Sequence, residues 1–498
     1  MSAFHNLQPA AALAAKAQSS SSQREVINKS SLGRCPSTLT TFSPSLHAKV
    51  TIFLPVTQSL MITFADRHNS TRRHTMILRS SRKPKFLCWT VLPAEIRLLI
   101  LEAITQQKHP GWASSAAVCK EWQFIIEREN FHQLKLHVPY LDDFQRIALR
   151  RQHIIHHICH DIELPRYTCR CCSWPESDAW TGQNSAIISI GIWKLFSILS
   201  GWNSVGQKGL TLELSAHSPS DSDHWFKHYR FTSDPVDGHE NDAVSGGDMG
   251  SGLLDDPQHG WMNNKQETPP PRSAVLRLFA TINLRFPAGL PRVDAVTRLT
   301  IRRQLRRRLQ PIVLQGLLSK LGRLKHMVYE PWREWNRLHT EVVDRGAYRS
   351  GCADGICLAN TNIWTTEYAF VIQNGLPKTL KTLSVFEDFD DSLAAALGDP
   401  RLPGPVFPAD AVRTVDPRIG AAFAFRSIDL EELSVSYLSN AEDFFRGCLQ
   451  TWTWEHLWSL ALTLTLLQPT GSRGKIYALL SSAAAAALRM PKLHTLVL

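Results

Sequence analysis

A short apolar phrase, Leu-x-x-Leu-x-apolar, recurs along the C-terminal half of this chain and limits the folds open to it. It occurs at Leu380–Val385, Leu430–Val435, Leu457–Leu462 and Leu493–Leu498, and in a looser form at Leu324–Tyr329. Alternate residues of a strand point to the same side, so the fourth and sixth residues of each phrase can enter one core. The leading Leu can pack under the preceding turn. The phrase therefore predicts a series of short strands that share a core.

The distances between the phrases indicate how these strands are connected. Successive phrases start 56, 50, 27 and 36 residues apart, which leaves room for a helix between strands but is less regular than a tight repeat. Further upstream, strand patterns at 132–138, 158–164 and 210–214 alternate with helical patterns at 141–152 and 188–199. This order favours parallel strands linked by crossover helices. We expect an α/β fold that resembles an irregular leucine-rich-repeat solenoid, with a plain α/β sheet domain as the alternative.

A second pattern lies nearer the N-terminus, in Leu92–Ile104 and Ala116–Asn130. In the first segment the apolar residues fall on one helical face, with Pro93 in the first turn, where proline is tolerated. His109-Pro110-Gly111 then breaks the helix, and the second segment carries more apolar residues than a small hairpin can bury. We expect short helices with a surplus apolar face, which implies a binding partner.

The order Leu-Pro-x-Glu-Ile-x-x-x-Ile-Leu, followed by Val-Cys-x-x-Trp, resembles the F-box, a three-helix module, over residues 90–131. The resemblance implies docking on the Skp adaptor of cullin-based ubiquitin ligases, with no catalytic residues. The docking positions that it implies are Leu92, Pro93, Ile96, Ile100, Leu101, Val118 and Trp122. The loop Thr105–Gly111 lacks the usual Asp-containing turn, and an ordinary amphipathic hairpin is the alternative.

An F-box followed by irregular leucine-rich repeats resembles fungal F-box proteins that act as substrate receptors. The likeness extends over most of residues 90–498 and names no target. It implies a non-enzymatic subunit that contacts the Skp adaptor, through it a cullin, and an unknown protein substrate. No HExxH, GxSxG or phosphate-loop motif favours an enzyme instead. We therefore expect neither catalytic residues nor a cofactor.

The net charge of +11 is concentrated at the N-terminus. Residues 1–88 hold twelve Lys or Arg and only two acidic residues, Glu25 and Asp66. This basic, Ser/Thr-rich segment is typical of a disordered extension, and a targeting segment is the alternative. The apolar run 50–64 is too short and too polar to span a bilayer, so we expect no membrane partner and a location in the cytoplasm or nucleus.

The remaining boundaries follow from composition. Residues 132–232 form the first part of the α/β region, and 273–498 form the repeat region. Between them, residues 233–272 are polar, acidic and rich in Gly and Pro, which predicts a disordered insertion. Because the chain ends on a repeat strand, we expect the array to be truncated at its C-terminus.

Six arginines lie within the segment Arg298–Arg308, where Ile301, Leu305 and Leu309 follow an i, i+4, i+8 spacing. This spacing predicts an amphipathic helix with a solvated basic face. Arg302, Arg303, Arg306 and Arg307 are then candidate contacts for an acidic or phosphorylated protein partner. Nucleic-acid binding through the same helix is the alternative function, which we favour less.

Cysteine is concentrated between Cys159 and Cys172, with Cys169, Cys171 and Cys172 almost adjacent. Zinc sites normally use two pairs of thiolate or imidazole ligands separated by a loop. Here the thiols are crowded together, so a single site would need a strained loop. We favour a cysteine-bearing surface loop over a structural zinc site.

Overall fold

The computed structural model describes residues 89–107, 111–202, 209–229, 255–333, 368–390, 393, 417–464, 466 and 472–498. The chain divides into two units, Met1–Lys85 and Phe86–Leu498, and every described residue belongs to the second unit. The predicted basic extension 1–88 lies outside the described residues.

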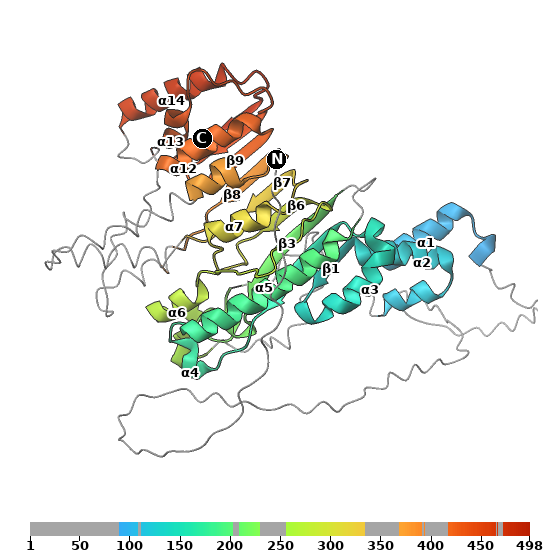
Figure 1. Ribbon diagram of the computed structural model, residues 1–498. Coiled ribbons are helices and arrows are strands. Elements are labelled where there is room, and N and C mark those ends of the chain that lie inside the picture. The colour runs from blue at the N-terminus through green and yellow to red at the C-terminus, as the bar shows by residue number, and fades with distance from the viewer. Residues whose placement is uncertain are drawn as a thin grey trace, which may run out of the picture. The chain divides into compact units, whose positions relative to one another are not determined.

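A nine-stranded parallel sheet forms the centre of the second unit (Figure 1). Each strand is added beside the preceding one, in the linear order β1-β2-β3-β6-β7-β8-β9-β10-β11. The strands are β1 (Gln133–Leu136), β2 (His157–Glu163), β3 (Leu210–His217), β6 (Val296–Ile301), β7 (His326–Tyr329), β8 (Thr382–Phe386), β9 (Glu432–Ser436), β10 (Ser459–Leu462) and β11 (Thr495–Val497). This open sheet confirms the α/β class and the parallel strand connections that were predicted.

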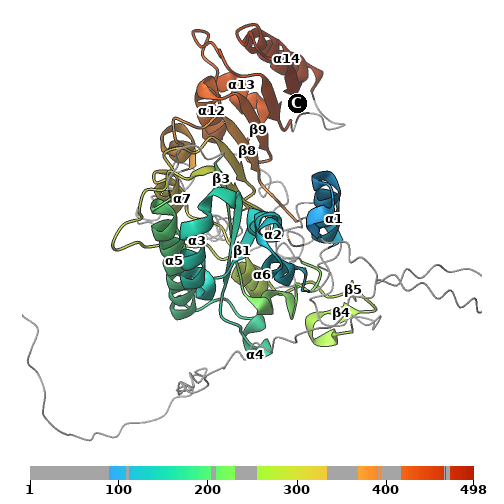
Figure 2. The same cartoon turned by 90° about the vertical axis from the view of Figure 1, so that its right-hand side faces the viewer.

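Helices connect the parallel strands, as crossover connections require. α1 (Ala94–Gln107) and α2 (Lys120–His132) precede β1. The helices between strands of the sheet are α3 (Leu141–Arg151), α4 (Cys169–Cys172), α5 (Asp178–Ser200), α6 (Arg272–Leu278), α7 (Pro311–Leu318), α12 (Pro417–Arg426), α13 (Ala441–Gly447) and α14 (Arg473–Ala487). Local sequence starts several of them: the Ser177 hydroxyl accepts from the Trp180 N–H before α5, and Pro311 opens α7. Figure 2 shows α5, α7 and α12 along the same side of the sheet. No helix in the described ranges is long and apolar enough to cross a membrane.

The five Leu-x-x-Leu-x-apolar phrases all coincide with strands, β7 to β11. The fourth residues form a row across the sheet, because Met327 pairs with Leu383, Leu383 with Leu433, and Leu433 with Leu460. All four of these side chains are buried, and so are the leading residues Leu324, Leu380, Leu430 and Leu457. The phrase therefore marks the core of the sheet, as predicted. The exception is Leu496, which is 38% exposed on β11 at the edge of the sheet.

A second, smaller core lies beside the loops that follow the carboxyl ends of β2, β3, β7 and β8. Its members include Tyr167, Trp225, Val275, Trp332 and Leu393. α4 and α6 frame it, together with an antiparallel hairpin of β4 (Trp261–Met262) and β5 (Lys265–Gln266).

The prediction that 233–272 is a disordered insertion is wrong for residues 255–272, and residues 233–254 lie outside the described part. The polar, turn-rich composition of 255–272 instead forms tight turns. Asn263 and Asn264 both adopt positive φ angles, of 52° and 64°, as a two-residue hairpin turn requires. Gly260 has a φ of 73°, and Trp261 is buried. His259, in the 3-10 turn just before this hairpin, contacts Trp225 of the second core.

Candidate functional site

The N-terminal helical unit consists of α1, a 3-10 turn over Trp112–Ala117, and α2. Pro93 precedes α1, where its missing N–H removes no helical hydrogen bond, and Glu95 in the first turn suits the positive end of the helix dipole. Cys119 is extended before α2, and its carbonyl accepts from the Gln123 N–H at 2.9 Å. The local sequence therefore produces two helices close to those predicted.

Glu121 on α2 contacts both Trp89, which precedes α1, and Arg97 on α1. It accepts a hydrogen bond from the Trp89 indole N–H at 2.9 Å and pairs with Arg97 at 3.2 Å. The Trp89 and Trp122 rings meet edge to face with centroids 5.0 Å apart. Polar and aromatic contacts therefore supplement the small apolar interior of this unit.

α1 carries apolar side chains on two faces. Leu101 is fully buried on the inner face of α1. Ile125 and Ile126 of α2 are also buried, each with 8% exposure or less. A second stripe at i, i+3, i+4 and i+7 comprises Ile96, Leu99, Ile100 and Ala103. Ile96 is 43% and Leu99 60% exposed, Ala103 is exposed, and Ile100 is half-buried. An amphipathic helix normally buries its apolar stripe, so an outward apolar stripe indicates a binding surface.

The seven predicted docking residues differ in their exposure to solvent. Pro93, Ile96 and Val118 are exposed, while Leu92, Ile100 and Trp122 are half-buried. Leu101 is wrong as a docking residue, because its side chain is fully buried within the unit. Among exposed apolar side chains of this unit that were not predicted as contacts, Leu99 lies on this stripe, and Val91, Leu98 and Phe124 are exposed as well.

Two acidic side chains are buried on β2 and β3. Asp161 lies 3.0 Å from the Lys135 ammonium and 3.1 Å from His217. Burial acts to raise the pKa of Asp161, but its contacts with His217 and Lys135 outweigh burial and lower this pKa to about 2. Glu213 pairs with His157 at 3.3 Å and with Arg302 at 3.5 Å. Each buried acid thus has two basic partners on the sheet or directly beside it, which favours a structural role.

The predicted amphipathic helix over Arg298–Arg308 is wrong. Arg298 lies on β6, and the residues after Ile301 form an irregular segment. The i, i+4 apolar spacing suits a helix, but pairing of β6 with both β3 and β7 holds the start of this segment extended. Tertiary pairing therefore outweighs the local pattern.

Three of these six arginines are buried rather than solvated: Arg306, Arg307 and Arg308. Arg306 lies over the rings of Tyr229 and Trp332, 4.6 and 4.3 Å from their centroids, and burial lowers its pKa to about 10. Arg307 pairs with Glu176 at 2.5 Å, and both side chains are 5% exposed or less. Guanidinium groups tolerate such sites because they are weakly hydrated and stack on aromatic rings.

Four arginines were predicted to contact an acidic partner, and this prediction is wrong for Arg306 and Arg307 because both are buried. Arg302 is partly exposed and paired with Glu213, and Arg303 is 54% exposed with Asp388 3.9 Å away. The arginines cannot act together as one basic face, which removes the basis of the nucleic-acid alternative.

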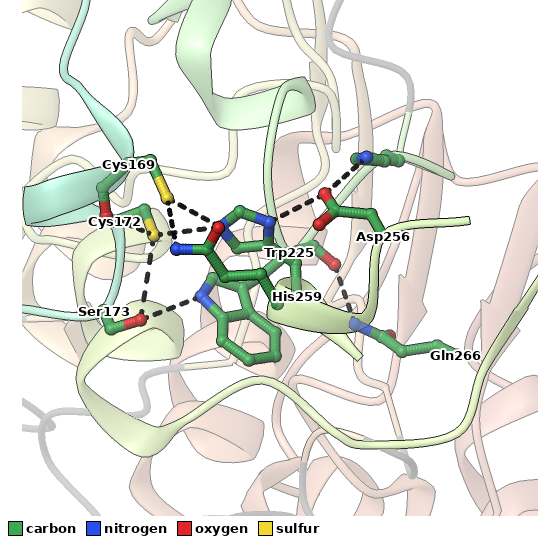
Figure 3. A network of polar contacts seen from close by, with 9 residues as sticks. Cys169, Cys172, Ser173, Trp225, Asp256, His259 and Gln266 are labelled. Atoms are coloured by element: carbon green, nitrogen blue, oxygen red, sulfur yellow. Dashed lines mark hydrogen bonds and ion pairs between the residues drawn. The ribbon is translucent and has the colours of Figure 1, made fainter. Parts of the chain in front are cut away.

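The cysteine segment also departs from the predicted surface loop. Cys159 is buried on β2, and Cys169 and Cys172 lie at the two ends of α4, with Cys172 buried. Cys169 Sγ and Cys172 Sγ each lie 3.3 Å from Nε2 of His259. Figure 3 shows these three side chains pointing toward one another. The thiols therefore meet a histidine from the hairpin region, far away in sequence.

Comparison with known families gives one match. Residues 375–498, about a quarter of the chain, match the model described as "Family of unknown function (DUF6546)". The matched region contains β8 to β11 and α12 to α14. A search of curated proteins finds no match. The C-terminal strands are therefore similar to this family, and the match assigns no activity.

Sequence reasoning missed several residues that the fold brings together. His224 and His259 are isolated in sequence, and His259 falls in a segment with the composition of a disordered insertion. Glu176, the partner of Arg307, precedes α5 and carries no motif. The one usable signal was the Cys-x-x-Cys spacing of Cys169 and Cys172, since two such thiols on one helical turn form half of a metal site.

Proposed function

We propose that this chain is the substrate-receptor subunit of a Skp-cullin-F-box ubiquitin ligase. In this proposal the α1–α2 unit is an F-box that docks on the Skp adaptor, and the strand array is a leucine-rich-repeat-like solenoid that holds a protein target. The chain acts by binding and catalyses no reaction of its own.

The outward apolar stripe of α1 carries the proposal. Exposed apolar side chains are ordinary when scattered singly, but here Ile96 and Leu99 adjoin Ile100 and Ala103 on one face. This stripe falls within the sequence that resembles an F-box. The strictly sequential order of the parallel strands supports the second part, because a solenoid adds each strand beside the last.

The test measures binding of the purified full chain to a recombinant Skp adaptor by isothermal titration calorimetry. A double variant, Ile96→Glu and Leu99→Glu, places charge on the stripe while leaving the buried Leu101 untouched. Complete burial of one such side chain is worth about 1.5 to 3 kcal/mol. Ile96 and Leu99 are already about half covered, so each loses roughly 1 kcal/mol, and affinity should fall at least about tenfold.

α3 offers a matched control. Ile147 and Leu149 are also exposed, at 44% and 70%, on a helix outside the docking unit. Ile147→Glu with Leu149→Glu should bind the adaptor like the wild type. The proposal fails if the wild type does not bind, or if both double variants bind equally.

A further inference from the structure

Four metal-ligating side chains converge beside the second core: Cys169, Cys172, His224 and His259. One ligand atom from each lies within 4.8 Å of all the others. They come from three segments that are distant in sequence: α4, the turns after β3, and the 3-10 turn Pro257–His259. The fold thus gathers two thiols and two imidazoles at one point.

We propose that these four residues bind a structural zinc ion. Two thiolates and two imidazoles are a common ligand set for tetrahedral zinc. Zinc–ligand distances of about 2.3 Å to sulfur and 2.0 Å to nitrogen would separate neighbouring S and N atoms by roughly 3.5 Å in a tetrahedral site. The two Sγ to Nε2 distances in the structure, both 3.3 Å, are close to that value.

The donor set selects among metals. Calcium and magnesium require oxygen ligands. The Rieske iron–sulfur centre also uses two Cys and two His, but it holds the thiols and the imidazoles on different irons, whereas the Sγ to Nε2 distances of 3.3 Å fit a single ion. Four protein ligands also leave no open coordination position, so the ion would be structural and not catalytic.

The surroundings of His259 orient it as a ligand. Its Nδ1 lies 2.7 Å from the Asp256 carboxylate, so Nε2 faces the two thiols (Figure 3). Asp256 is itself held by the Lys227 ammonium at 2.6 Å. A carboxylate behind a histidine is the usual outer contact of a zinc ligand, because it fixes the ring and its tautomer.

His224 supplies an independent observation. Its Nε2 atom is buried, and it has no hydrogen-bond partner among the described residues. A buried polar atom without a partner is unfavourable, and a metal ion would satisfy it. The His224 and His259 rings lie 4.9 Å apart between centroids, and a ring nitrogen of each lies within 4.8 Å of both thiol sulfurs.

A metal ion here would fasten residues 255–272 to α4 and to the chain after β3. Trp225, next to His224 in sequence, packs edge to face on His259 and hydrogen-bonds to Ser173 at 3.1 Å. Gln266 of the hairpin donates to the Trp225 carbonyl at 2.9 Å. The site therefore crosslinks the small core at the carboxyl ends of the strands.

The test is the zinc content of the full chain, purified with a reducing agent, by inductively coupled plasma mass spectrometry. The wild type should carry about one zinc per chain, as the four-ligand site requires. Cys172→Ser and His224→Gln should lose most of it. Two neighbours outside the cluster provide matched controls, and Cys171→Ser and His228→Gln should retain zinc.

Cobalt binding to the metal-stripped wild type provides a second measurement. It uses no variant, so it tests the proposal even if the variants fail to fold. Tetrahedral thiolate coordination should produce visible absorption bands and a thiolate-to-cobalt charge-transfer band, and one equivalent of zinc should abolish them. Absence of zinc together with absence of these bands would overturn the proposal. So would equal zinc content in the ligand variants and controls, or a disulfide between Cys169 and Cys172 in the reduced preparation.

Discussion

The buried pair of Arg307 and Glu176 gives the sharpest stability prediction. The sequence pattern alone places Arg307 on a solvated face, where its replacement would matter little. In the structure the two charges lie 2.5 Å apart, and Asn184 also donates to Glu176 at 3.1 Å. Arg307→Gln therefore leaves a buried carboxylate without its charged partner.

Breaking a buried pair from one side typically costs about 3 to 5 kcal/mol. That is a large fraction of the roughly 5 to 15 kcal/mol that stabilises a typical domain. Arg303→Gln is the matched control, because the Arg303 side chain is 54% exposed and its guanidinium lies 3.9 Å from Asp388. An exposed pair of this kind contributes only about 0 to 1 kcal/mol.

Urea denaturation followed by circular dichroism measures both free energies of unfolding. We expect Arg307→Gln to lower the midpoint clearly and Arg303→Gln to leave it nearly unchanged. A second step replaces both partners in one variant, Arg307→Met with Glu176→Gln. Its loss of unfolding free energy should be smaller than the sum of the losses in the single variants Arg307→Met and Glu176→Gln. Equal midpoints for Arg307→Gln and Arg303→Gln would refute the placement of this segment.

Three further predictions follow from the sheet and its helices. Leu433→Ala should destabilise the fold by roughly 2 to 5 kcal/mol in urea denaturation, whereas Leu496→Ala, at a position 38% exposed, should cost clearly less; equal losses would contradict the sheet assignment. Burial lowers the pKa of His160 from 6.5 to about 4, so the unfolded state binds the proton more readily and stability is lost as pH falls from 6.5 to 4. This loss approaches roughly 3 kcal/mol, and denaturation of His160→Gln at pH 7 and pH 5 should show a weaker pH dependence than the wild type. Gly191→Ala should lower the melting temperature, because an added Cβ would lie 2.9 Å from Val138 Cγ2; an unchanged melting temperature would argue against this close approach.

The sequence predicted the strands well because their signal is local. Each Leu-x-x-Leu-x-apolar phrase combines a buried leading Leu with a two-residue alternation, and neither depends on distant residues. The helix Leu141–Arg151 was predicted almost to the residue, since its apolar spacing and its acidic first turn agree.

The errors arose where distant contacts decide the structure. The spacing of Ile301, Leu305 and Leu309 fits a helix, yet strand pairing and the aromatic rings around Arg306 hold the segment irregular. Likewise, nothing near His259 in the sequence shows that Cys169 and Cys172 will meet it.

The docking residues were predictable only in part. The helical spacing of the apolar residues in α1 shows which of them share a face. Which face is buried and which is exposed depends on how α2 packs against α1. Leu101 and Leu99 are both apolar and only two positions apart, yet one is fully buried and the other 60% exposed.

Hydrogen–deuterium exchange of the full chain, with and without the Skp adaptor, tests the proposed docking most directly. We predict that the adaptor slows exchange in peptides covering α1 and the start of α2, while peptides covering α12 and α13 exchange as before. Protection confined to the strand array, or no protection anywhere, would contradict the assignment of α1 as the adaptor-binding helix.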